Sequence, residues 1–393
     1  MICFSPINWD EVWEGPQEIM SQFAASGWNV LFVENIGGRT PRFAIHDLSR
    51  IGERIRRLLV APRFDVPPPR GIAVHTPLNL PPYRPRVVHN LNRRLLLNSL
   101  RSRLRTLGWE RPVVWTYNPS RLVLECCSAL DARLTIYCCV HDFRKLSPRH
   151  EHIARDEEQM LKKADLVFDV SRHLLERNSA AGLTIHQLPQ GANLSHYLSH
   201  SSVHPEKTEL TDLPRPVIGY IGTVHEWVDQ DLILNAARSR PDWTFVLIGP
   251  ERVSTSRLRK QRNVVLLGHR AHAQLRHYVS GFDVGIVPYL TSKGGRSLRP
   301  NKVLEYLVMG KPVVTTDLPE LKEFSQAILS IDTHEQFIPA LELALSTDSA
   351  QKRRQRRELA IANSLQKSFP LLQSLVISKL AECRPTVGSS SSH

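Results

Sequence analysis

The stretch Phe282–Leu321 reads FDVGIVPYLTSKGGRSLRPNKVLEYLVMGKPVVTTDLPEL. It begins with an apolar run over 283–288, passes through a polar loop with two adjacent glycines, and reaches a second apolar run over 312–316. Between these runs, Pro300 suits the first turn of a helix, where a missing N–H costs nothing. The pattern predicts a strand, a helix and a second parallel strand, which is the repeating unit of an α/β fold.

The same alternation extends outward over nearly the whole chain. In the first half we predict strands at 29–34, 112–117, 134–140, 165–170 and 184–188, with helices at 15–26, 89–107, 120–130, 150–163 and 172–181. In the second half we predict strands at 216–220, 244–248, 263–267, 283–288, 312–316 and 327–331, and a helical tail at 349–382. Apolar strands that alternate with helices are typical of parallel sheets covered on both faces. The sequence therefore predicts two doubly wound, Rossmann-like domains that face each other across a ligand-binding cleft.

The predicted domain boundaries follow the breaks in this pattern. A segment rich in Ser, His and Pro interrupts the alternation and is interpreted as a linker. The predicted parts are a first domain over 1–193, a linker over 194–214, a second domain over 215–360, a helical tail over 361–385, and a disordered tail or tag over 386–393.

Composition favours an ordinary globular protein with no membrane span. Hydrophobic residues make up 41% of the 393 residues and charged residues 23%, so neither a disordered chain nor a low-complexity one fits. The chain has no apolar run of the length a membrane span needs, and its first residues do not resemble a secretory signal. The adjacent pairs Cys126–Cys127 and Cys138–Cys139 lack the spacing of zinc or disulfide sites. We expect a cytoplasmic protein.

The net charge of +13 is concentrated in one segment. Between Arg39 and Arg105 there are 15 arginines against three acids, a difference of +12. Such a surface attracts phosphates of lipids, nucleic acids or anionic substrates, unless it is simply a solvated face. Within it, Arg93–Arg105 (RRLLLNSLRSRLR) predicts either a basic amphipathic helix on an anionic membrane or a core helix whose leucines pack inward.

The opening stretch also carries a candidate phosphate site. Arg296, Arg299 and Lys302 surround the predicted helix start, where exposed N–H groups favour anions. Glu305 lies on the same helical face as Asn301 and Lys302, and its carboxylate is suited to accept hydrogen bonds from ribose hydroxyls. The alternative is a solvated Lys302–Glu305 pair on an ordinary helix.

At this point the sequence resembles a known family. The pattern PxKxxEYLxxGKPVV after a strand ending in PY is similar to the donor-binding segment of family 4 glycosyltransferases of the GT-B fold. A bacterial subgroup that includes the teichuronic acid glycosyltransferases is the better match. Further matching segments occur in order along the chain: Trp13–Gln17 with Val30–Glu34, Tyr137–Asp142 (YCCVHD), Glu157–Glu158, Ala164–Ser171, Leu188–Asn193, Gly219–Val224 (GYIGTV) with Trp227 and Asp229, and Leu247–Pro250.

The resemblance implies a role for each matching position. It implies a nucleotide-diphosphate sugar donor, for which a UDP-sugar is one candidate, and a last helix that returns to the first domain. Lys302 would neutralise the diphosphate, Glu305 would bind the ribose, and Gly15 with Gln17 would face the sugar or acceptor. The other implied donor-binding positions are Gly222 and Thr223 beside the phosphates, and Gly249, Pro250 and Gly268 around the base.

The predicted catalytic pair is His141–Asp142, at the carboxyl end of a first-domain strand. A histidine that titrates near neutrality can take the acceptor's proton, with Asp142 orienting it or acting in its place. We expect catalysis without a metal ion or a cofactor, because we expect no D-x-D pair to hold a divalent ion between the phosphates. The family likeness implies retention of the anomeric configuration, although a His/Asp base would equally serve inversion.

Several positions depart from the family pattern and leave the substrate open. Ser297 stands where many relatives have the first glutamate of an E-x7-E pair, and backbone N–H groups near Ser297–Arg299 would have to replace that contact. The HEWVDQD segment after Gly222 lacks the usual arginine and lysine, and His141 replaces an aspartate. The acceptor is unassigned, with lipid-linked or anionic molecules in cell-surface polysaccharide or glycoconjugate synthesis as candidates.

Three alternatives remain open at this stage. One is a nucleotide-sugar 2-epimerase of the same fold, which would need no acceptor. Another is a basic nucleic-acid- or membrane-binding protein without catalysis, although no nucleic-acid-binding signature is present and we expect no nucleic acid partner. The last is a GT-B scaffold that binds nucleotide without turnover. If the membrane helix forms, the enzyme would be peripheral on the inner face of the membrane.

Overall fold

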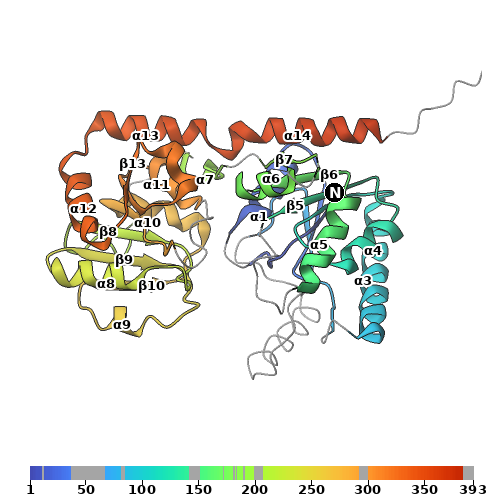
Figure 1. The fold of residues 1–393 in the computed structure, drawn as a ribbon, viewed down its shortest axis with the longest axis horizontal. Coiled ribbons are helices and arrows are strands. Elements are labelled where there is room, and N and C mark those ends of the chain that lie inside the picture. Colours follow the sequence, from blue (N-terminus) through green and yellow to red (C-terminus); the bar gives the residue numbers. More distant parts are fainter. Residues whose placement is uncertain are drawn as a thin grey trace, which may run out of the picture. The chain divides into compact units, whose positions relative to one another are not determined.

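The computed structural model shows two compact units (Figure 1). The first unit comprises Met1–Pro189 and the segment from Phe369 onward, and the second comprises Gln190–Ser368. The residues that the structure describes are 1–10, 13–36, 67–80, 85–140, 151–170, 172–179, 182, 184–188, 191–198, 207–291 and 300–383.

In the first unit, seven strands of the described chain form a parallel sheet in the order β3-β2-β1-β4-β5-β6-β7. The strands are β1 (Ile2–Phe4), β2 (Val30–Val33), β3 (Ile72–His75), β4 (Val113–Thr116), β5 (Leu134–Cys139), β6 (Leu166–Asp169) and β7 (His186–Gln187). The helices are α1 (Gly15–Ala25), α3 (Arg86–Leu107), α4 (Arg121–Ala129), α5 (Glu151–Lys163) and α6 (Arg172–Ser179). The order reverses between β1 and β4, as in a doubly wound sheet.

In the second unit, six strands of the described chain form a parallel sheet in the order β10-β9-β8-β11-β12-β13. They are β8 (Val217–Ile221), β9 (Thr244–Ile248), β10 (Val264–Gly268), β11 (Val284–Val287), β12 (Val313–Thr316) and β13 (Ile328–Ile331). The helices are α7 (Ser195–Leu198), α8 (Gln230–Ser239), α9 (Ser256–Arg259), α10 (Leu275–Gly281), α11 (Lys302–Val308), α12 (Phe337–Ser346) and α13 (Ala350–Ala362), with short 3-10 turns at His272–Gln274, Pro319–Phe324 and His334–Gln336. Both sheets confirm the predicted doubly wound architecture.

Each sheet is buried because its strands are apolar on both faces. Every residue of β4, β5, β8, β9 and β11 is buried, and helices supply the apolar layers against them. The second core also includes Leu194, Tyr197 and Leu210, which lie in the segment that the sequence pattern assigned to a linker. That segment therefore contributes side chains to the second unit instead of only connecting the two.

The structure of helix α3 decides between the two predictions for Arg93–Arg105, a membrane-surface helix and a core helix. Leu96, Leu97, Leu100 and Leu104 point into the first core and are at most 6% exposed. The arginines of the same helix, among them Arg94, lie on the solvent side. The leucines are therefore core residues, and the predicted alternative of an apolar helix face lying in a membrane is wrong for them. Among the described helices, none is long and apolar enough to cross a membrane.

The predicted tail over 349–382 forms two helices, α13 and α14 (Leu365–Glu382), that are separated at Asn363–Ser364 (Figure 1). From Phe369 onward, α14 belongs to the first unit. There the ring of Phe369 packs edge-on against Phe23 of α1, with centroids 4.8 Å apart. Arg133 also donates to the carbonyl oxygen of Leu380 at 3.3 Å.

Candidate functional site

The candidate site lies where the strand order of the second sheet reverses, between β8 and β11. Side chains and backbone at the carboxyl ends of these strands border the crevice in which doubly wound folds bind ligands. Tyr306 of α11 helps to shape the crevice. Its hydroxyl accepts a hydrogen bond from the Ile221 N–H at 2.9 Å, and its ring fills the space above Gly285, where an added Cβ would come within 2.5 Å of it.

The turn after β8 is built from glycine because the backbone there is both unusual and crowded. Gly222 has a φ of +124°, and its N–H donates to the Ile248 carbonyl at 2.8 Å. Gly249, after β9, has a φ of +148°, and its N–H donates to the Gly268 carbonyl at 2.8 Å. These bonds tie the ends of β8, β9 and β10 together, so the three predicted donor-binding glycines, Gly222, Gly249 and Gly268, lie at one edge of the second sheet.

Lys302, the first residue of α11, reaches over this turn. Its Nζ atom donates to the Tyr289 hydroxyl at 2.8 Å and lies 4.0 Å from the centre of the Tyr220 ring. A Cβ atom added to Gly222 would lie 2.5 Å from the same Nζ, so the ammonium rests directly against the glycine backbone. A cation held at this point is suited to meet a phosphate.

Glu305 lies one turn further along α11 and is only 9% exposed. Burial raises the pKa of its carboxyl group from 4.5 to about 7, against the opposing effects of the Lys302 charge and the Tyr197 hydroxyl. A carboxylate that has lost most of its water gains strongly from any hydroxyl that donates to it. The predicted solvated surface pair of Lys302 and Glu305 is therefore wrong, because Glu305 is buried and Lys302 bonds to Tyr289.

The other predicted donor residues form backbone hydrogen bonds in this structure. The Thr223 carbonyl accepts from the Tyr220 hydroxyl at 2.9 Å, and the Pro250 carbonyl accepts from the Val224 N–H at 2.8 Å. The Asn301 carbonyl accepts from the N–H groups of α11. The predicted residues Arg296 and Arg299, with Ser297, lie outside the described residues, as does the predicted catalytic pair His141–Asp142.

The two first-unit candidates behave differently. Gln17 is fully buried: its amide oxygen accepts from the Glu14 N–H at 3.2 Å, and its amide nitrogen donates to the Asn8 carbonyl at 3.3 Å. The bond from Glu14 is part of a capping box at the start of α1. Because Gln17 is buried and both ends of its amide bond to the protein, the expectation that it faces the sugar is wrong. Gly15 has open space instead, since an added Cβ would meet no atom within 4 Å.

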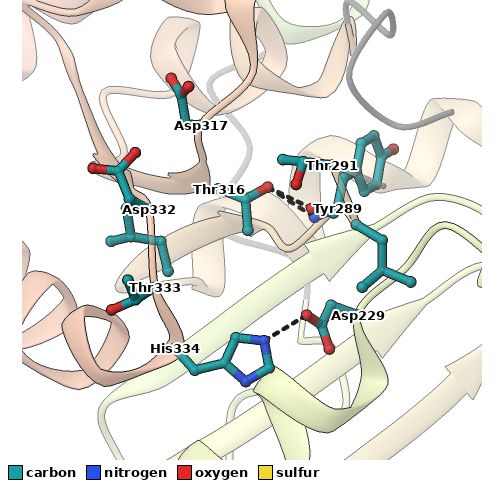
Figure 2. Close-up of a pocket in the computed structure, with 10 residues that line it drawn as sticks. Asp229, Tyr289, Thr291, Thr316, Asp317, Asp332, Thr333 and His334 are labelled. Atoms are coloured by element: carbon teal, nitrogen blue, oxygen red, sulfur yellow. Dashed lines mark hydrogen bonds and ion pairs between the residues drawn. The ribbon is translucent and has the colours of Figure 1, made fainter. Parts of the chain in front are cut away.

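A polar pocket of about 530 Å³ shares Tyr289 with the site (Figure 2). The residues that line it follow β11, end or follow β12 and β13, or precede α8: Asp229, Tyr289, Leu290, Thr291, Thr316, Asp317, Ile331, Asp332, Thr333 and His334. Its carboxylates repel a diphosphate, whereas carboxylates and threonine hydroxyls both accept hydrogen bonds from ligand hydroxyls. The pocket therefore suits a neutral polyhydroxy group better than a phosphate.

One Asp-x-Asp pair is present after all, at Asp229 and Asp231. Asp229 caps α8 by accepting from the Leu232 N–H at 2.9 Å, and its other oxygen lies 2.7 Å from Nε2 of His334 (Figure 2). Asp231 pairs with Arg257 at 2.6 Å. Both carboxylates already have protein partners in this structure, and the expectation that no such pair holds a divalent ion stays a prediction.

The three tyrosines of this site have no role among the sequence predictions. Tyr220, Tyr289 and Tyr306 each stand inside a quoted motif, namely GYIGTV, the PY that ends a strand, and EYL. Their positions in those motifs are the signal that could have identified them. What they do depends on contacts between residues that are far apart in the sequence, such as the 85 positions between Ile221 and Tyr306.

The second unit is similar to a known protein family. Residues 215–346, which include all six strands of the second sheet and all the described donor positions, match the family described as Glycosyl transferases group 1. TuaH of Bacillus subtilis (strain 168), a proposed teichuronic acid biosynthesis glycosyltransferase, is 29% identical over 186 residues. That match covers 45% of this chain and 47% of TuaH, so it spans about half the length of the relative.

Solved structures extend the likeness to both units. Sucrose-phosphate synthase from Thermosynechococcus elongatus is similar with a TM-score of 0.66 and 14% identity, over 97% of this chain and 99% of that one. Anabaena Alr3699/HepE in complex with UDP and glucose is similar with a TM-score of 0.64 and 15% identity, over 97% of this chain and 98% of that one. The comparisons confirm the GT-B fold and the resemblance to glycosyltransferases of the teichuronic acid type.

Proposed function

We propose that this chain is a glycosyltransferase that moves a sugar from a nucleotide-diphosphate sugar to an acceptor hydroxyl. The observation that carries the proposal is the position of Lys302, whose ammonium rests against the Gly222 turn beside the buried carboxyl of Glu305. One group is suited to a diphosphate and the other to ribose hydroxyls. They lie within the segment that matches the glycosyl transferases group 1 family.

The proposed chemistry needs charge stabilisation more than it needs covalent participation. When the bond between the anomeric carbon and the diphosphate breaks, negative charge grows on the leaving phosphate. Lys302, held in advance of the reaction, would stabilise that charge, and such preorganised electrostatics is usually the largest catalytic contribution. His141 with Asp142 stays the proposed pair that receives the acceptor's proton, and the proposed outcome is retention of configuration without a metal or cofactor.

UDP is the first nucleotide to test, because similar folds have been solved with UDP and glucose and with UDP-glucose in Anabaena HepE. The likeness to TuaH favours an acceptor in cell-surface polysaccharide synthesis. The comparisons favour neither the 2-epimerase nor the non-catalytic nucleic-acid-binding alternative.

A thermal-shift series tests the donor site. The protein is heated with UDP, GDP, ADP or dTDP, and separately with the common nucleotide sugars of each. A ligand at about 100 times its dissociation constant should stabilise the protein by roughly 2.7 kcal/mol. We expect one nucleotide to stabilise the protein, and Lys302→Ala and Glu305→Ala to remove the shift. The exposed residues Lys322 and Glu358 provide matched controls, since Lys322→Ala and Glu358→Ala change the same charges elsewhere. If no nucleotide shifts the melting temperature, the proposed function is wrong.

We also propose a peripheral contact with an anionic membrane through the arginines of α3. Arg94, Arg101 and Arg105 are exposed and, by helical spacing, share one face. None of the three forms an ion pair with another described residue. We expect phosphatidylglycerol vesicles, but not phosphatidylcholine vesicles, to sediment the protein. Replacing all three arginines by glutamine should weaken this binding, and unchanged binding would assign the contact to another surface.

A further inference from the structure

Lys302 is held by tyrosines and not by a carboxylate. Its Nζ donates to the Tyr289 hydroxyl at 2.8 Å, lies 4.0 Å from the Tyr220 ring centre, and lies 5.1 Å from the Tyr289 ring centre. Within the part of the chain that the structure describes, no carboxylate oxygen comes within ion-pair distance of this ammonium. Aromatic faces attract a cation without neutralising it, so the positive charge stays available for an anion.

Both tyrosines are themselves fixed. Tyr220 is fully buried on β8, and its hydroxyl donates to the Thr223 carbonyl at 2.9 Å, which orients its ring under the glycine turn. Tyr289 is 6% exposed, and its backbone N–H and carbonyl both bond to the Thr316 hydroxyl, at 3.2 and 2.7 Å. The two fixed rings therefore form a rigid binding surface for the Lys302 ammonium at the ends of the neighbouring strands β8 and β11.

The Lys302 ammonium has little room to move between these rings and the glycine turn. Because a Cβ on Gly222 would lie 2.5 Å from Nζ, the ammonium packs against the backbone of the turn. A flexible lysine loses rotational freedom about several bonds when it binds a phosphate, which costs conformational entropy. This cost is smaller if the side chain is already ordered before binding. The hydroxyl of Tyr289 fixes the lateral position of Nζ, and the ring of Tyr220 fixes its height above the sheet.

We infer that Tyr289 and Tyr220 are positioning residues that preorganise Lys302 for the diphosphate of the donor. This inference rests on the proposed function, and it goes further by naming residues that act on the phosphate through Lys302. A positioning role predicts a selective effect: loss of the Tyr289 hydroxyl should weaken the binding of a nucleoside diphosphate and leave the binding of its parent nucleoside unchanged.

The experiment is a double-mutant cycle read by calorimetric titration with UDP and uridine, and with GDP and guanosine as a second pair. Tyr289→Phe should weaken diphosphate binding about tenfold in the otherwise unchanged protein. In a Lys302→Met background the same substitution should change it less than about twofold, because the group that it positions is gone. Tyr220→Leu should behave in the same way as Tyr289→Phe.

Tyr278→Phe is the matched control. Its hydroxyl bonds to Glu209 and Arg270 and does not contact Lys302, so the substitution should leave the affinity ratio of diphosphate to nucleoside unchanged. If Tyr289→Phe weakened diphosphate binding equally in both backgrounds, it would act only on the fold and the inference would be overturned. The inference would also be overturned if Tyr289→Phe had no effect on diphosphate binding. If the unchanged protein binds neither diphosphate, the proposed function itself is wrong.

Discussion

A Cβ atom added to Gly249 would lie 2.2 Å from the carbonyl oxygen of Gly222. The two glycines end neighbouring strands, and each needs a positive φ that other residues rarely adopt. The turn of β8 and the turn of β9 can therefore come this close only if position 249 lacks a side chain. This contact sets the height of the backbone below the Lys302 ammonium.

We predict that Gly249→Ala destabilises the protein by roughly 2–4 kcal/mol, because backbone strain and a backbone clash add together. Gly268→Ala is the comparison: its φ is +69°, but an added Cβ meets no atom within 4 Å, so strain alone should cost about 1–2 kcal/mol. Urea unfolding of both variants measures the difference. An equal or larger loss at Gly268 would contradict the crowding argument.

Gly15 allows function to be separated from stability. It is the first residue of α1, and an alanine there has open space, so Gly15→Ala should change the free energy of unfolding by less than about 0.5 kcal/mol. If Gly15 faces the sugar or acceptor, turnover of the nucleotide sugar should still fall at least about tenfold, since even a methyl group displaces a close ligand. The check combines urea unfolding with a transfer assay. Unchanged turnover would remove Gly15 from the proposed site.

The strand pattern could be predicted from the sequence because both sheets are parallel and buried. Runs such as Thr244–Ile248 and Leu134–Cys139 are apolar apart from one threonine each, and such runs need no tertiary information. The missed strands, β1 (Ile2–Phe4) and β3 (Ile72–His75), have only three and four residues. Other strands are as short but were predicted as part of longer runs, whereas β1 and β3 stand in no longer run. Pairing with β2 on either side is what makes β1 and β3 strands.

The site could be predicted in part. Lys302 and Glu305 were proposed from residue type and spacing, and Gly222 from the family resemblance. Tyr289 and Tyr220 were not proposed, because a tyrosine beside an apolar strand is as typical of a core residue as of a functional residue. Gln17 was misassigned because a capping box and a ligand contact use the same amide, and only the bonds to Glu14 and Asn8 distinguish them.

Leu100→Ala tests the assignment of α3 to the core. Leu100 has no exposed surface, so the substitution should destabilise the protein by about 2–5 kcal/mol through lost burial and a residual cavity. Binding to phosphatidylglycerol vesicles should be unaffected, measured by sedimentation at a temperature where the variant is folded. Leu91→Ala on the same helix, at a side chain that is 44% exposed, should cost much less. A loss of vesicle binding with Leu100→Ala but normal stability would contradict the core assignment.

The buried carboxyl of Glu305 predicts a pH dependence of stability. Its pKa is about 7 in the folded protein against 4.5 ordinarily, so stability that is fully present below pH 4.5 is lost as pH rises through 7. That shift corresponds to at most roughly 3 kcal/mol. Glu305→Gln keeps the shape without the titration, so the ligand-free variant should gain stability relative to the unchanged protein between pH 5 and pH 8.

Urea unfolding of both proteins at pH 5, 6.5 and 8 measures this difference. Saturating nucleotide should reduce it, because ribose hydroxyls that donate to the ionised carboxylate lower its pKa in the complex. The Gln variant should therefore gain less from nucleotide at pH 8 than the unchanged protein does. Parallel pH profiles for the two ligand-free proteins would mean that Glu305 ionises with an ordinary pKa, and the desolvated ribose site would have to be abandoned.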